Sequence, residues 1–158
     1  MNKLALFCEG QTECIFAERL IRHVAGEQQV TIQVQRMSGP RHLRRIVIEG
    51  ESDAGDNYFV LLVNCGQDES VKSDIRDQYD GLISLGYQTI LGFRDVHPLS
   101  RDDLALLREG LEYQMPTAPI LPCMILAIME VEAWFLAEHT HFPRIHKDLN
   151  VDRIKTNS

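Results

Sequence analysis

The sequence predicts a three-layer α/β domain, in which helices cover both faces of a mostly parallel central sheet. Short apolar segments of strand type alternate along the chain with longer segments of helical periodicity, an order typical of such sheets. The 158 residues suffice for one domain with a real core. The content of 44% hydrophobic and 25% charged residues is that of a folded globular protein.

The first half of the chain carries most of the strand signals. Residues 3–8 are a continuous apolar run that predicts a buried strand, and residues 30–35 alternate as a half-exposed strand does. Residues 58–63 are β-prone throughout, as expected of a strand buried on both faces. Residues 41–49 can form a short helix. A longer helix is predicted over 13–26, with its apolar face made of Ile15, Phe16, Leu20, Ile21 and Val24.

The second half continues the alternation. A helix over 70–85 is closed by Gly86, a strand follows at 89–93, and Ser100 can cap a helix over 101–113. The last strand is expected at 124–128 and the last helix at 130–138, where Trp134 is interpreted as packing that helix on the sheet. Residues 1–138 are therefore taken as one domain. Residues 139–158 form a polar tail, which we interpret as the start of a truncated segment.

Composition excludes several classes of protein. The four cysteines lack the spacing of zinc ribbons and are expected to be buried free thiols. No apolar run approaches the roughly 18 residues that span a bilayer, and the N-terminal run is too short for a signal peptide, so we expect a cytoplasmic protein with no membrane partner. The net charge of −7 argues against nucleic-acid binding by the whole surface. A solvated helix face is the favoured interpretation of the one dense cationic cluster, which contains Arg36, Arg41, His42, Arg44 and Arg45.

The first strand leads directly to an acid. Glu9 follows the strand, Gly10 would let the backbone turn without a Cβ penalty, and Thr12 would cap the next helix. Binding crevices form at the carboxyl ends of strands in open α/β sheets. An ordinary strand–helix junction also explains the capping residues, but it explains Glu9 less well.

Acids also follow two later strands, at Asp95 and at Glu130 with Glu132. In a parallel sheet these carboxylates converge on one edge, where they repel unless a cation bridges them. Carboxylate oxygens suit Mg²⁺ or Mn²⁺, and such an ion could serve phosphoryl transfer. Acids after strands are also common as helix caps, and that interpretation stays open.

Two segments resemble a known family. FCEGQTE, residues 7–13, resembles the first motif of the Toprim (topoisomerase–primase) superfamily. MEVEAWFLAE, residues 129–138, is similar to a signature of a Toprim-like family of unknown function that is often encoded beside ATPases. The family's Asp-x-Asp pair is best matched by ILGFRDVHP, residues 90–98, with Asp95 as the first acid and His97 in place of the second. Asn64, at the preceding strand end, is a weaker candidate.

The resemblance implies a Rossmann-like fold and a nuclease or phosphodiesterase that uses Mg²⁺ or Mn²⁺ on nucleic acid. Glu9 would handle protons or bind metal, and Asp95 would hold the metal with His97 or Glu130. Phosphates would be neutralised by Arg94 or by Arg41, Arg44 and Arg45. Candidate partners are an ATPase in a phage-defence system and a second copy of the chain.

Two other functions stay open. A non-catalytic interaction or sensor subunit is the first, because His97 replaces an acid. A small-molecule phosphatase or nucleotide-binding protein could use the same acids.

Overall fold

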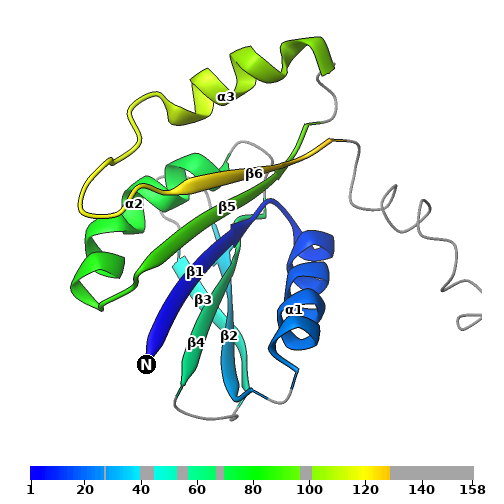
Figure 1. Cartoon of the computed structure of the whole chain (residues 1–158), viewed down its shortest axis with the longest axis vertical. Coiled ribbons are helices and arrows are strands. Elements are labelled where there is room, and N and C mark those ends of the chain that lie inside the picture. Colours follow the sequence, from blue (N-terminus) through cyan, green and yellow to red (C-terminus); the bar gives the residue numbers. More distant parts are fainter. Residues whose placement is uncertain (27, 40–44, 53–56, 67–69, 97–100, 129–158) are drawn as a thin grey trace, which may run out of the picture.

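The computed structural model describes residues 1–26, 28–39, 45–52, 57–66, 70–96 and 101–128. Strands and helices alternate along most of them, as the sequence predicts, except that β2, β3 and β4 follow one another directly (Figure 1). In chain order the elements are β1 (Asn2–Cys8), α1 (Gln11–Ala25), β2 (Val30–Ser38), β3 (Arg45–Ser52), β4 (Tyr58–Asn64), α2 (Ser70–Ser84), β5 (Thr89–Asp95), the 3₁₀ turn η2 (Arg101–Asp103), α3 (Leu104–Glu112) and β6 (Cys123–Ala127).

The six strands form one sheet in the order β3-β2-β4-β1-β5-β6. Every neighbouring pair is parallel except β2 and β3, which are antiparallel. The predicted mostly parallel sheet is therefore confirmed, and the architecture is compatible with a Rossmann-like fold. Since β1 lies between β4 and β5, the carboxyl ends of these three strands meet at the middle of one edge.

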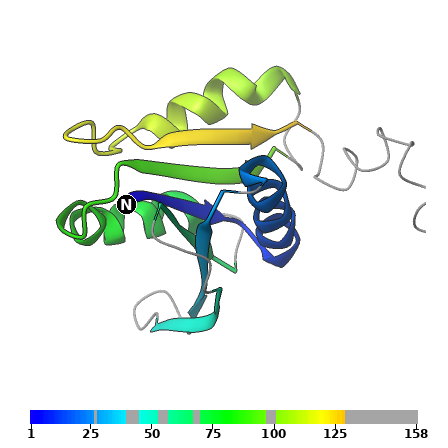
Figure 2. The ribbon, with the colours of Figure 1, turned by 60° about the horizontal axis from the view of Figure 1, so that its bottom comes forward.

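Two apolar cores, one on each face of the sheet, hold the layers together. On one face Phe7 and Val63 pack with Val71 and Ile75 of α2. On the opposite face Leu62 packs with Cys14 and Ala17 of α1, among others. Helix α3 is tied to α2, because Lys72 Nζ donates a hydrogen bond to Gly110 O at 2.7 Å. Helices thus cover both faces, as the turned view shows (Figure 2).

The predicted helix over 41–49 is wrong for the residues that are described. Arg45 begins strand β3, which pairs with β2, and residues 40–44 lie outside the described part of the chain. The β-branched run Ile46-Val47-Ile48 favours a strand, and pairing with β2 satisfies the hydrogen-bonding groups of its backbone on one side. Arg36 of the cationic cluster therefore sits on a strand, where its Nε lies 2.8 Å from Glu49 Oε1.

The apolar face predicted for the first helix is also wrong in part. Helix α1 buries the small residues Cys14 and Ala17, whereas Ile15, Leu20 and Val24 are 44%, 47% and 76% exposed. Apolar residues lie around more than one side of this helix, so periodicity does not settle which strip faces the sheet. Small side chains at the contact let the helix approach the strands closely.

Other predictions stand with small shifts or fall outside the described residues. Gly86 closes α2 with φ +79°, as expected. Cys8, Cys14 and Cys65 are buried thiols outside any disulfide, but Cys123 is exposed because β6 is an edge strand, so the prediction of four buried thiols is wrong for it. None of the described helices is long and apolar enough to cross a membrane. The predictions for Ser100, for a helix over 130–138 and for the tail over 139–158 concern residues that are not described.

Candidate functional site

Glu9 and Asp95 meet at the carboxyl edge of the sheet. Cys8 pairs in register with Phe93, so the residue after β1 faces the end of β5. The backbone N–H of Asp95 donates a hydrogen bond to Glu9 Oε2 at 2.8 Å. Glu9 is only 8% exposed, and Asp95 Oδ1 is a buried atom. An aspartate carboxylate lies within a few ångströms of its own backbone nitrogen, so the two carboxylates are close neighbours.

The turn after Glu9 differs in detail from the prediction. Gly10 has φ −143°, an extended conformation open to any residue, so its backbone does not require glycine. A Cβ at Gly10 would instead lie 3.0 Å from Glu13 Oε2, and this close approach is what a larger residue would disturb. Thr12 is not the cap, because α1 begins at Gln11 with Gly10 at the N-cap and without a side-chain cap bond. Glu13 is buried in the first turn of α1, where the helix dipole favours a carboxylate.

On the other side of β1, an amide occupies the end of β4. Asn64 is 4% exposed, and its Nδ2 donates to Gln11 Oε1 at 2.9 Å. Its Oδ1 accepts a hydrogen bond from the Gly66 backbone N–H, also at 2.9 Å. Gly66 has φ +70°, a conformation that favours glycine. Asn64 therefore ties the end of β4 to the start of α1.

The thiol next to Glu9 is buried beside Cys14. A hydrogen bond with the Cys14 side chain, together with burial, raises the pKa of Cys8 well above its ordinary value. The reactive form of cysteine is the thiolate, and a raised pKa disfavours that form. Its carbonyl accepts a hydrogen bond from Cys65 N–H at 2.9 Å, which fixes the two strand ends together.

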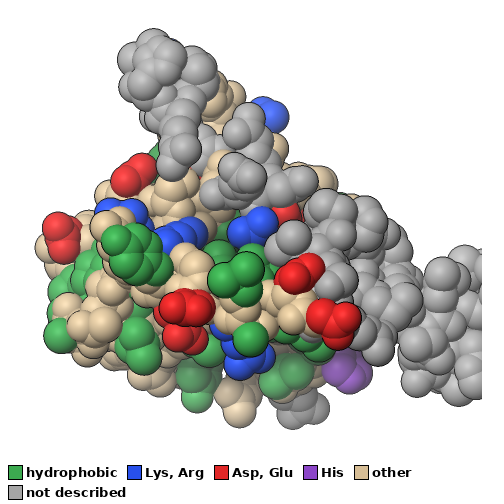
Figure 3. Space-filling view, turned by 90° about the horizontal axis from the view of Figure 1, so that it is seen from above, with side chains coloured by type: hydrophobic (Ala, Val, Ile, Leu, Met, Phe, Trp, Pro, Cys, Tyr) green, Lys and Arg blue, Asp and Glu red, His purple; other side chains and the backbone are tan. Residues whose placement is uncertain are grey.

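Two basic residues, the acid Asp103 and several apolar residues line a cleft of about 460 Å³ on the face that carries α2 and α3. The cleft is formed in part by Arg94, Lys72 and Leu107. Arg94 Nε is buried and has no hydrogen-bond acceptor among the described residues. Burial and the nearby charge of Arg76 lower the pKa of Lys72. Lys and Arg side chains gather near one another on the side of the molecule seen from above (Figure 3).

The predicted site residues thus divide into three groups. Glu9 and Asp95 meet at the ends of β1 and β5, whereas Arg94, the residue before Asp95, borders a cleft on the α2 and α3 side whose described lining includes neither acid. Arg45 pairs with Ser38 at the same edge, but β2 and β4 separate it from β1. Arg41, Arg44, His97 and Glu130 lie outside the described residues. Within the described ranges there is no group of three or more His, Cys, Asp or Glu side chains placed to hold a metal.

Sequence reasoning missed Lys72. It stands in the first turn of a helix with no motif around it, and only the packing of α2 on β5 brings it to the same cleft as Arg94.

The structure places the chain among α/β proteins with a mostly parallel sheet and an acidic site at the carboxyl ends of its central strands. Comparisons with family models, with curated proteins and with solved structures found no match.

Proposed function

We propose that the chain is a Toprim-like phosphodiesterase that uses a divalent metal ion to cleave nucleic acid. The observation that carries this proposal is the partly buried hydrogen bond that holds the nearly buried Glu9 against the strand end of Asp95. The parallel order β4-β1-β5 around the acidic turn supports the Toprim resemblance. A nearly buried carboxylate beside a second, half-buried one is unfavourable for folding alone, and such pairs cluster at functional sites.

The donor set at this edge fits a hard divalent cation. Mg²⁺ is commonly bound by one or two carboxylates, with water and substrate phosphates completing its shell. Glu9 and Asp95 supply two carboxylates from adjacent strands, and they are the residues that would hold Mg²⁺ or Mn²⁺. When bound, the ion would polarise the phosphate and lower the pKa of a water molecule.

The protein's own residues would position and neutralise the substrate. The Asp95 N–H fixes the orientation of the Glu9 carboxylate, which would accept the proton of the attacking water. Arg94 follows Phe93 on β5 and borders the cleft beside this edge. Its buried Nε would donate to a phosphate oxygen, a charge-assisted hydrogen bond that also removes the penalty of a buried donor without an acceptor. Lys72 would add a second positive charge to the same cleft.

Calorimetric titration with Mn²⁺ and cleavage of plasmid and single-stranded DNA test the proposal. Glu9→Gln and Asp95→Asn should abolish both metal binding and cleavage. Asp80→Asn is the matched control, because Asp80 is exposed in the distal half of α2 and should change neither. Absence of Mn²⁺ binding by the wild-type chain would overturn the proposal, as would undiminished cleavage by Glu9→Gln.

A second candidate is a non-catalytic Toprim-like subunit that works with an ATPase in phage defence. Asn64 favours it, because the strand end beside β1 carries an amide committed to two hydrogen bonds instead of an acid. This candidate predicts a folded wild-type chain that binds neither Mn²⁺ nor DNA and forms a complex with its ATPase. The cytoplasmic location expected from the sequence stays a prediction.

A further inference from the structure

Strand β3 is an outer strand of the sheet. Of the described strands only β2 pairs with it, and Figure 2 shows β3 at the outside of the sheet. Its consecutive apolar residues Ile46, Val47 and Ile48 are 52%, 41% and 61% exposed. An outer strand presents a row of backbone N–H and C=O groups on its free side, and an exposed apolar strand of this kind readily pairs with another strand. The strand β3 therefore has the features of an interaction surface.

The exposed apolar residues of β3 lie on both faces of the sheet. Ile46 pairs in register with Met37, whose side chain packs against the core beneath α2. Successive residues of a strand point to opposite faces. Ile46 and Ile48 therefore lie on the face that carries α2, and Val47 lies on the face that carries α1.

Opposite charges stand at the two ends of this apolar run. Arg45 is two residues from Val47 and so lies on the same face. Glu49 also lies on that face, because its Oε1 is 2.8 Å from Nε of Arg36, the residue that pairs with Val47. The register with β2 skips Glu49, which is therefore the extra residue of a β-bulge and ends the regular edge. The regular edge thus has an apolar centre, a positive charge at its start and a negative charge at its end.

This run is complementary to itself when two copies pair antiparallel. With Val47 opposite Val47 of the second copy, each Ile46 faces Ile48, and each Arg45 faces Glu49. Residues directly opposite each other then lie on the same face, as pairing requires, and apolar pairs and opposite charges in such positions are stabilising. A shift of the register by two positions would place Val47 opposite Arg45 or Glu49. The pattern therefore selects a second copy as the partner and one register of pairing.

We propose that β3 pairs antiparallel with β3 of a second copy of this chain, with Val47 at the two-fold axis. The sheets of the two copies join into one, and Ile46 and Ile48 of both copies form an apolar cluster on the face of α2. Antiparallel pairing directs the Glu9 edges of the two copies toward opposite ends of the joined sheet. One short strand buries less than the roughly 1,600 Å² of a typical stable complex, so the dimer should dissociate on dilution. This inference does not depend on the proposed function.

Sedimentation velocity of the full-length chain, from low micromolar to near-millimolar concentration, tests the dimer. The wild type should pass from monomer to dimer over this range. Val47→Lys places two ammonium groups opposite each other at the axis and should raise the dissociation constant by roughly tenfold or more. Far-UV circular dichroism checks that the variant is folded.

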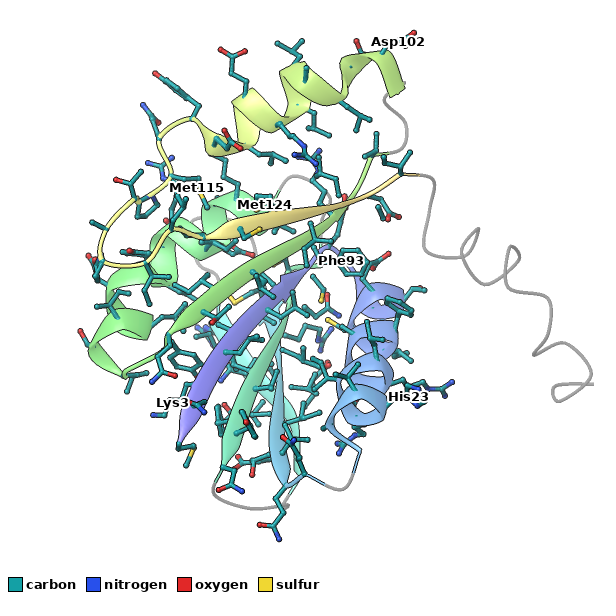
Figure 4. All side chains as sticks on the ribbon, in the orientation of Figure 1. Lys3, His23, Phe93, Asp102, Met115 and Met124 are labelled. Carbon is teal, nitrogen blue, oxygen red and sulfur yellow. The ribbon has the colours of Figure 1, made fainter. Side chains whose placement is uncertain are left out.

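Leu85→Lys is the matched control and should leave the dissociation constant unchanged. Leu85 is also an exposed apolar residue, at 63%. Its carbonyl accepts a hydrogen bond from Lys3 Nζ at 2.8 Å, and Lys3 lies at the amino end of β1 (Figure 4). The strands β4 and β2 separate β1 from β3, so this substitution adds the same charge away from the proposed contact.

Two charge variants test the register. Arg45→Glu and Glu49→Arg each place like charges opposite each other in their own homodimers, and each should raise the dissociation constant by roughly tenfold. An equimolar mixture of the two variants restores opposite charges at both positions, so the mixed dimer should form about as tightly as the wild type. Glu49→Arg also loses the ion pair with Arg36, but it does so alone and in the mixture alike, so that loss cannot produce the recovery.

Four results would overturn the inference. They are a wild type that stays monomeric over the whole range, a folded Val47→Lys that dimerises as the wild type does, a mixture that associates no better than its two components, and a dimer that Leu85→Lys weakens as much as Val47→Lys does.

Discussion

Removal of the Glu9 acceptor should separate the structural role of this side chain from its chemical one. Glu9→Ala leaves the Asp95 N–H, now bonded at 2.8 Å, without its acceptor in a buried place. An orphaned buried donor costs about 1–3 kcal/mol, and we expect the free energy of unfolding to fall by that amount. Glu9→Gln keeps an oxygen at the same position and should stay within about 1 kcal/mol of the wild type.

The assay is urea unfolding followed by far-UV circular dichroism, with the midpoint and the slope compared for the wild type and the two variants. An unchanged slope with a lower midpoint for Glu9→Ala would show a loss of native-state stability. The reasoning is refuted if Glu9→Ala is as stable as the wild type, or if Glu9→Gln loses as much as Glu9→Ala. Because no metal is added, this outcome is independent of the catalytic proposal.

Three further predictions concern packing, hydrogen bonding and pH. Gly92→Ala should lower the free energy of unfolding by about 1–3 kcal/mol in urea unfolding, because its Cβ would overlap Met124 Sδ. The double variant Gly92→Ala with Met124→Ala should lose less free energy of unfolding than the two single variants lose together. Tyr79→Phe should lower stability by about 1–3 kcal/mol in the same assay, since the hydroxyl donates to Ile120 O at 2.6 Å and accepts from Ile120 N–H at 3.0 Å; unchanged stability would contradict this. Burial raises the pKa of Tyr87, so the folded state holds this proton more tightly than the unfolded state, and stability should fall as pH rises above about 10. The stability of Tyr87→Phe should fall less steeply over that pH range than the stability of the wild type. An equal slope for the two proteins would exclude Tyr87 as the cause.

The strand pattern could be predicted from the sequence because a buried strand consists of a local run of apolar residues. The run at 58–63 became the central strand β4, with Val60, Leu61, Leu62 and Val63 all buried. Two predictions failed where local signals were ambiguous. Residues 45–49 have little intrinsic helix preference and were drawn into the sheet by pairing with β2, and α1 turned its small residues inward because they fit the sheet more closely.

The sequence predicted residues of the candidate site, but not how they are arranged. Acids after strands mark a sheet edge, and Glu9 and Asp95 were found by that rule. The rule does not say which strands are neighbours. It also does not say which of the two strand ends beside β1, the one with Asn64 or the one with Asp95, contacts Glu9. The contribution of Lys72 could not be anticipated, because its place beside Arg94 depends on how α2 packs on β5.

By itself, the sequence determined the class of fold and the presence of a carboxylate at the end of the first strand. Both follow from local periodicity and from the position of a residue relative to its own strand. Only the tertiary structure decided that β1 lies between β4 and β5, that the Asp95 N–H holds Glu9, and that one side of α1 stays open. The strand order and the bond to Glu9 depend on contacts between residues up to 86 positions apart, and hydrophobic periodicity carries no information on such pairings.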